Sequence, residues 1–358
     1  MIFKKKKRIK YILAPQTKFY DSMAAKWKPF VMFNQFANIR SKYCNTDIYG
    51  LRFNELKNQN KESSIFEQYS DDKKDEALII GNSLSFGEGQ TQDSKTISNL
   101  LSKNTKYNFY NLSGRGFSGF QEIINFLMFK KKIKKLKKII IISGLNDAYL
   151  PFFIKKFDES QTPIFGYDRF NKVMSKASRG WKNSIFKFFF SGLINRRDEI
   201  WDRVNSLNWK EELFGKDVKF NQKNNNLSRI ESMKEIMSRN IDIWSTIGKG
   251  MNIQVDFVLQ PVGSWCNEKK TEQEERIFFE EDQIPSLHNV YKHVEKEKYK
   301  EVKKLIKGLT DKNSIRFLDM NQVFDNTEYS DKWIFTSKFH VTDLGSKIIA
   351  ENLSKELL

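Results

Sequence analysis

Four residues, far apart in the chain, have the groups that acyl transfer needs. They are Ser83, Gly116, Asn146 and His340. A serine hydroxyl becomes a nucleophile when an imidazole takes its proton, and a glycine N–H and an asparagine amide can both donate to the oxyanion that then forms. The set predicts a site in which a hydroxyl, an imidazole and two hydrogen-bond donors lie around one point.

Each of these residues also has an ordinary structural interpretation. Ser83 or Ser85 can be the N-cap of the helix that follows, and Asn146 or Asp147 can cap the next helix in the same way. His340 can be a solvated loop residue. The glycines around position 116 can belong to a flexible connection. The positions of the four segments relative to the predicted strands favour the catalytic interpretation.

Five short runs, rich in apolar and aromatic residues and followed by polar residues or glycine, are the predicted strands. They are Ala77–Ile80, Tyr107–Leu112, Lys138–Ile142, Ile253–Gln260 and Ile315–Met320. Helical patterns follow them at Thr96–Lys103, Phe120–Lys135, Leu227–Ile247, Glu272–Leu309 and Ile348–Leu357. Such alternation predicts an α/β fold, a parallel sheet with helices on both faces. Ser83, Gly116 and Asn146 each follow a strand, so the carboxyl edge of the sheet should bring them together, and we expect His340 at the same edge.

Two parts of the chain are predicted to lie outside this core. Residues 1–72 form an aromatic and basic leader, whereas 73–358 form the α/β domain, interrupted by a long helical insertion over 150–226. The strongly aromatic stretch 181–190 within that insertion can act as a lid, lie in a membrane interface, or pack into a small core of its own.

Composition limits the partners and the compartment. The 358 residues are 39% hydrophobic, carry a formal charge of +18 and include two cysteines. Apolar runs are too short to span a bilayer, and neither a disulfide framework nor a Cys/His zinc pattern is present. The cytoplasm is the default location, with peripheral contact to an anionic membrane as an alternative.

The positive charge favours anionic partners of any kind. Two lysine-rich runs, Lys4–Arg8 and Lys130–Lys138, carry much of it, and the second is expected to be a solvated surface at the end of a helix. Neither run contains interleaved aromatic residues, and no nucleic-acid-binding motif is found, so nucleic acid is a disfavoured partner. The other two histidines, His288 and His293, are expected at the surface.

Together the four segments resemble the sequence blocks of the SGNH, or GDSL-type, hydrolase family. Residues 81–85 (Gly-Asn-Ser-Leu-Ser) are similar to its nucleophile block, and Gly116 to its glycine block. Residues 144–147 (Gly-Leu-Asn-Asp) resemble its asparagine block, and 340–345 its histidine block. The order of the blocks and their placement after successive strands also agree with the family.

The resemblance implies a three-layer α/β/α, flavodoxin-like fold and a serine esterase or acyltransferase that needs no metal or cofactor. Ser83 would attack an acyl carbonyl, and His340 would move the proton. The backbone N–H groups of Ser83 and Gly116 and the Asn146 amide would hold the oxyanion. By analogy to bacterial relatives in polysaccharide metabolism, the substrate would be an O-acyl, acetyl-type group on a carbohydrate.

Two positions depart from the family pattern. Asn82 stands where the family name has Asp, a nearly isosteric change, and Ser337 stands where the triad Asp is usual, three residues before His340. That Asp orients the imidazole and stabilises its protonated form. Here His340 must use the Ser337 hydroxyl, a backbone carbonyl or a carboxylate such as Asp331. The alternatives are a Ser–His dyad with a weaker base or narrow substrate range, and a catalytically weak or inactive protein that binds anionic ligands or a membrane surface.

Overall fold

The computed structural model describes residues 8–55, 63–69, 73–153, 163–167, 170, 172, 226–266 and 269–358. Most of the predicted insertion, including the aromatic stretch 181–190, lies outside the described residues, as does most of the first lysine-rich run.

Five parallel strands form the central sheet in the order β4-β3-β5-β6-β7. They are β3 (Asp75–Gly81), β4 (Tyr107–Asn111), β5 (Leu136–Ser143), β6 (Gln254–Leu259) and β7 (Arg316–Asp319). All five predicted strands are therefore confirmed. The chain moves outward from β3 in both directions, which is the flavodoxin-like strand order, and the reversal between β3 and β5 places a crevice at the carboxyl edge.

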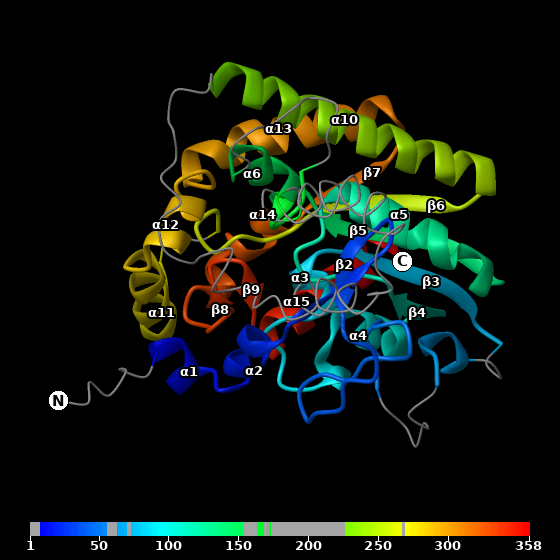
Figure 1. Cartoon of the computed structure of the whole chain (residues 1–358), viewed down its shortest axis with the longest axis horizontal. Helices are drawn as coiled ribbons and strands as arrows, with labels where there is room; N and C mark the ends of the chain where they lie inside the picture. Colours follow the sequence, from blue (N-terminus) through cyan, green and yellow to red (C-terminus); the bar gives the residue numbers. More distant parts are fainter. Residues whose placement is uncertain are drawn as a thin grey trace, which may run out of the picture.

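The central strands are apolar because helices cover both faces of the sheet (Figure 1). Leu78 and Ile80 point into one hydrophobic cluster, whereas Ala77 and Ile79 point into the other. Helices that contribute to the first cluster are α5 (Gly119–Phe129), α6 (Leu145–Phe153), α10 (Asn226–Met251), α12 (Pro285–Tyr291) and α13 (Lys296–Lys312). Those that contribute to the second are α4 (Ile97–Asn104), α11 (Glu272–Asp282), α14 (Met320–Phe324) and α15 (Asp343–Leu357).

Smaller elements lie around this three-layer core. The helices are α1 (Ile9–Leu13), α2 (Gln16–Ser22) and α3 (Ser83–Phe86), and the antiparallel hairpins are β1 (Ala25–Lys28) with β2 (Met32–Gln35) and β8 (Phe335–Ser337) with β9 (His340–Val341). Short 3-10 turns occupy Ile65–Glu67, Asp93–Lys95, Lys130–Lys132 and Thr327–Tyr329. Among the described residues, no helix is both long enough and apolar enough to cross a membrane.

The described part of the leader is not separate from the core. Leu51, Phe53 and Ile65 are fully buried in the same cluster as Leu78 and Ile80. The expectation that the leader lies outside the core is thus wrong for these residues, because its apolar side chains cover part of one face of the sheet.

Helix α5 is shorter than predicted. It ends at Phe129 instead of continuing to Lys135, because a 3-10 turn follows and β5 starts at Leu136, level with Glu76. In the lysine run that follows α5, Lys131 and Lys132 are exposed as expected. Lys138 is the correction, since it is buried and its Nζ lies 2.7 Å from Oδ2 of Asp256.

Candidate active site

Ser83 lies at the carboxyl edge of the sheet, immediately after β3. It is the first residue of α3, and the side chain of Asn82 accepts a hydrogen bond from the Leu84 N–H at 3.1 Å. Asn82 is therefore the N-cap, and the interpretation of Ser83 or Ser85 as the cap is wrong. Because Asn82 performs the capping, the Ser83 hydroxyl does not turn back onto its own helix.

His340 lies on the β8–β9 hairpin and contacts Ser83, although the two residues are far apart in the sequence. Its Nε2 is 2.8 Å from the Ser83 Oγ, and its Nδ1 is 2.8 Å from the Ser337 Oγ. The first distance is that of a hydrogen bond between a nucleophile and its base. The structure thus brings together the two residues expected to carry the chemistry.

Ser337 occupies the position beside Nδ1 where a triad carboxylate would stand. Its hydroxyl oxygen also accepts the backbone N–H groups of Phe339 at 3.3 Å and His340 at 3.1 Å. Asp331, the other acid considered for this role, is exposed. Of the alternatives left open by the sequence, the structure shows the hydroxyl of Ser337 at hydrogen-bond distance from Nδ1.

A buried carboxylate that sequence reasoning missed lies on the opposite side of the imidazole. An oxygen of Glu88 is 3.9 Å from the His340 Nε2 and 2.7 Å from the Arg115 Nε. The Arg115 guanidinium in turn donates to the backbone carbonyls of Tyr20 at 2.8 Å and Met23 at 3.2 Å. Glu88 is therefore part of an ion pair held between the nucleophile segment, the glycine-rich segment and α2.

The pKa of Glu88 shows that this carboxylate stays ionised. Burial alone would raise its pKa, but the positive charges of Arg115, His340 and Lys10 outweigh burial and lower it to about 2. A permanent negative charge near Nε2 favours the protonated imidazole.

Local backbone geometry brings Glu88 close to the hairpin. Gly89 has a φ of +103°, and a Cβ on it would lie 2.7 Å from the Thr336 hydroxyl and 3.0 Å from the Val341 carbonyl. Only glycine permits this close approach to β8 and β9. The sequence signal that could have indicated Glu88 is its place between Gly87 and Gly89, directly after the nucleophile segment.

The other two predicted residues are linked to each other, because the Asn146 amide donates to the carbonyl of Phe117, next to Gly116, at 2.6 Å. Gly116 has a φ of +74°, in the left-handed region that glycine adopts readily. Asn146 and Asp147 lie inside the first turn of α6, so the N-cap interpretation is wrong for both. Asp147 instead accepts the Gly119 N–H at 2.9 Å, at the start of α5.

Aromatic side chains join these segments to the histidine hairpin. The Tyr149 hydroxyl donates to Oδ1 of Asn146 at 3.1 Å. Its ring lies parallel to that of Phe339, with 6.1 Å between centres, and is 5.8 Å from that of Phe165. Since Phe339 precedes His340, α6 contacts both the glycine-rich segment and the hairpin. The four segments therefore converge at one edge of the sheet.

The remaining histidines take no part in this site. His288 is exposed, as expected. His293 is half-buried: its ring stacks on Phe152 with centres 4.8 Å apart. Burial, followed by the charges of Lys292, Arg229 and Lys298, lowers its pKa to about 4.

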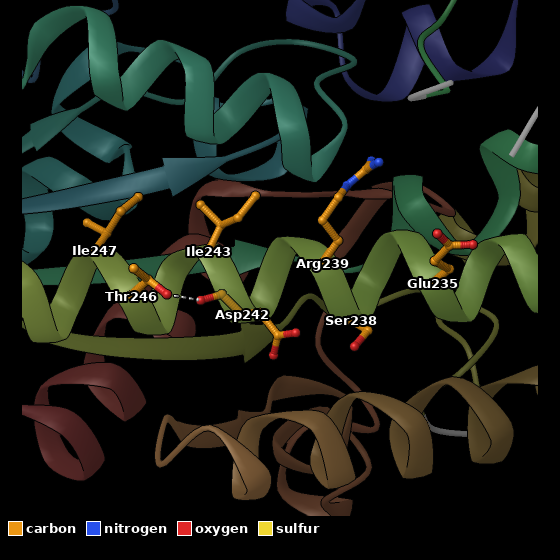
Figure 2. Close-up of a pocket in the computed structure, with 7 residues that line it drawn as sticks. All are labelled: Glu235, Ser238, Arg239, Asp242, Ile243, Thr246 and Ile247. Carbon is orange, nitrogen blue, oxygen red and sulfur yellow. Dashed lines mark hydrogen bonds between the residues drawn. The ribbon is translucent and has the colours of Figure 1, made fainter. Parts of the chain in front are cut away.

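A separate pocket of about 460 Å³ lies along α10 (Figure 2). Its lining residues all come from that one helix, and they are Glu235, Ser238, Arg239, Asp242, Ile243, Thr246 and Ile247. No histidine or cysteine lines it, and none of the residues predicted for the chemistry belongs to it.

Comparison with known proteins gives only distant similarities. No family model matches the chain, and no curated protein matches it. Among solved structures, a GDSL-family lipolytic protein from Veillonella parvula is 10% identical with a TM-score of 0.41, over 79% of this chain and 97% of its own. An acetylxylan esterase from Geobacillus stearothermophilus is 11% identical with a TM-score of 0.38, over 79% of this chain and 93% of its own. A lipase/acylhydrolase from Enterococcus faecalis is 9% identical with a TM-score of 0.39, over 79% and 97%.

Proposed function

We propose that this chain is a serine-dependent ester hydrolase or acyltransferase of the SGNH type, with Ser83 as nucleophile and His340 as base. The observation that carries the proposal is the 2.8 Å separation of Ser83 Oγ and His340 Nε2, two atoms from opposite ends of the α/β domain. The strand order and the convergence of the four segments are consistent with it.

In the proposed reaction, Ser83 Oγ attacks the acyl carbonyl carbon while its proton passes to Nε2 of His340. The leaving alcohol takes that proton as the tetrahedral intermediate collapses, and the acyl group stays on Ser83. Water then attacks the acyl-serine in a hydrolase, or a second hydroxyl attacks it in an acyltransferase.

The backbone N–H groups of Ser83 and Gly116 and the amide of Asn146 are the proposed oxyanion donors. A side-chain amide carries two N–H bonds, and the contact with Phe117 uses one of them. Loss of one oxyanion donor typically costs about 2.7–4 kcal/mol of transition-state stabilisation.

Glu88 provides a negative charge beside the imidazole in a chain that lacks the usual triad Asp. It lies near Nε2 rather than Nδ1, so it cannot orient the imidazole as a triad carboxylate does. Its charge nevertheless stabilises the imidazolium formed during attack, while Ser337 holds the ring from the other side.

For the substrate we propose an acetyl-type ester on a carbohydrate. The support is that two of the similar solved structures are described as acetyl xylan esterases. The chemistry is tested with a simple ester.

The test is hydrolysis of an aryl acetate by the full chain and by the Ser83→Ala variant. We expect kcat/KM to fall by about 10⁴-fold or more, because the nucleophile is lost. Ser94→Ala, at a half-buried serine outside the four segments, is the matched control and should keep the wild-type rate.

Labelling with a fluorophosphonate gives a second measurement. The label should map to Ser83 and be lost in His340→Ala. Equal rates for wild type and Ser83→Ala, with no labelling at Ser83, would falsify the proposal and favour the alternative of a non-catalytic protein.

A further inference from the structure

A strongly charged segment lies at the amino edge of the sheet, where α5 ends and β5 begins. The segment between them is strongly basic: Lys131, Lys132, Lys134 and Lys137 are all exposed. No acidic residue interrupts the sequence from position 130 to 138. The proposed ester chemistry uses none of these residues.

Large apolar side chains are exposed beside these lysines. Leu127 and Met128, in the last turn of α5, are 44% and 42% exposed. Lysines with long apolar stems next to exposed leucine and methionine are typical of surfaces that enter a membrane interface. We call this surface the basic-apolar face, and define it as Leu127, Met128, Lys131, Lys132, Lys134 and Lys137.

The β1–β2 hairpin packs along α5 and has an exposed aromatic residue at its turn. Gln121 of α5 donates to the Val31 carbonyl at 2.6 Å, and the Lys28 Nζ lies 4.7 Å from the centre of the Phe129 ring. Phe30 stands in the turn between these two anchored residues and is 80% exposed. The hairpin therefore presents an exposed aromatic ring alongside α5.

The basic-apolar face and the candidate active site lie at opposite edges of the sheet (Figure 1). Strand β5 has eight residues and runs from one edge to the other. At about 3.3 Å per residue, the two regions are separated by about 26 Å. A partner bound at the amino edge would leave the crevice around Ser83 open.

We propose that the basic-apolar face docks this protein onto an anionic lipid bilayer. Lysines are attracted to acidic head groups, and Leu127 and Met128 can enter the boundary between head groups and acyl chains. Nucleic acid fits less well, because binding of single strands needs stacking aromatic residues interleaved with the charges. The charge of +18 on the whole chain also attracts the protein to an anionic bilayer.

The test is cosedimentation of the full chain with vesicles of phosphatidylcholine, alone or mixed with phosphatidylserine. We expect binding only to the mixed vesicles, and less binding as salt is raised. Changing Lys131, Lys132, Lys134 and Lys137 to Gln should weaken this binding by at least about tenfold.

A charge-matched control separates local docking from bulk charge. Lys298, Lys300, Lys304 and Lys307 are exposed on α13, and changing all four to Gln removes the same total charge. We expect less than about a twofold effect from this control. Equal losses of vesicle binding in both quadruple variants would overturn the proposal, because any positive surface of the protein would then bind the vesicles.

The apolar part has its own variant. Leu127→Gln with Met128→Gln should reduce binding while leaving the charge unchanged, and it tests the proposal even if the lysine variant fails to fold. Absence of vesicle binding by wild type would also overturn it. So would binding of duplex DNA by wild type that the face variant loses as completely as it loses vesicle binding. Hydrolysis of a soluble aryl acetate should be the same in all these variants, so failure of docking and failure of the esterase proposal are distinguishable.

Discussion

Two groups of charged residues, one at each edge of the central sheet, differ in exposure. At the carboxyl edge, Glu88 and Arg115 are largely buried and paired with each other, and their contacts extend to His340 and α2. At the amino edge, Lys131 and Lys132 are exposed. Buried charges hold one geometry, whereas exposed charges remain available to a partner. The net charge of the chain therefore includes buried charges that hold the structure and exposed charges that are available to a partner.

The largest expected effect separates two neighbouring lysines at the amino edge. Lys138 is buried against Asp256, whereas Lys137 is exposed. Lys138→Met removes one partner of the buried Asp256, which keeps its contact with Arg316 Nε at 3.0 Å. The free energy of unfolding should therefore fall by about 3 kcal/mol, the lower end of the range for breaking a buried ion pair. Lys137→Met should change it by less than about 0.5 kcal/mol. Urea denaturation measures the free energy of unfolding of both variants. Equal losses would contradict the view that Lys138 stabilises the fold and Lys137 does not.

An effect of similar size tests the buried charge at the carboxyl edge. The pKa of Glu88 is lowered from 4.5 to about 2, so folding favours its ionised form. This stabilisation is fully present above about pH 4.5 and is lost as the pH falls toward 2, a change of about 3 kcal/mol. Glu88→Gln should therefore lose less stability than wild type between these pH values, as measured by urea denaturation.

The same variant should change the pH dependence of catalysis. Without the carboxylate near Nε2 the imidazolium is less stable, so the acidic limb of the kcat/KM profile should move to lower pH. Glu272→Gln, at an exposed acid on α11, is the control and should leave both profiles unchanged. An unaltered catalytic profile in Glu88→Gln would show that the ion pair serves only the fold.

The smallest expected effect sharpens the assignment of Ser337. The backbone N–H groups of Phe339 and His340 already point at its side chain, so an aspartate there would find donors in place. Ser337→Asp should raise kcat/KM for an aryl acetate by about tenfold, because a carboxylate at Nδ1 orients the imidazole and stabilises its protonated form. Ser337→Asn, of similar size and uncharged, should give no increase. A fall in rate for the aspartate variant alone would indicate that Glu88 already supplies all the charge that the site tolerates.

The fold was predictable because its strands are buried on both faces. Runs such as Leu78–Ile80 and Ile139–Ile142 have no polar interruption, and their alternation with helices leaves few topologies. The pairing of Ser83 with His340 followed from the same logic, since both were expected at the carboxyl edge.

The missed features depend on contacts between distant segments. Glu88 becomes important only because Arg115 and His340 lie beside it, and no spacing in the chain reveals that arrangement. Likewise, Lys138 belongs to a lysine run by sequence, but β6 places Asp256 next to it. Propensity and periodicity describe one segment at a time, and these pairings come from the order of strands and loops.

The contact between Arg115 and α2 bears on how short an active form of this protein can be. Arg115 is held by the carbonyls of Tyr20 and Met23, which are main-chain atoms outside the α/β domain. A truncated chain starting at β3 would keep Ser83 and His340. Its Arg115 would lose the hydrogen bonds to both carbonyls and would donate to water instead. Such a fragment would also lack Leu51, Phe53 and Ile65, which are buried in the core of the intact chain. Poor turnover by it would therefore say nothing about the intact chain.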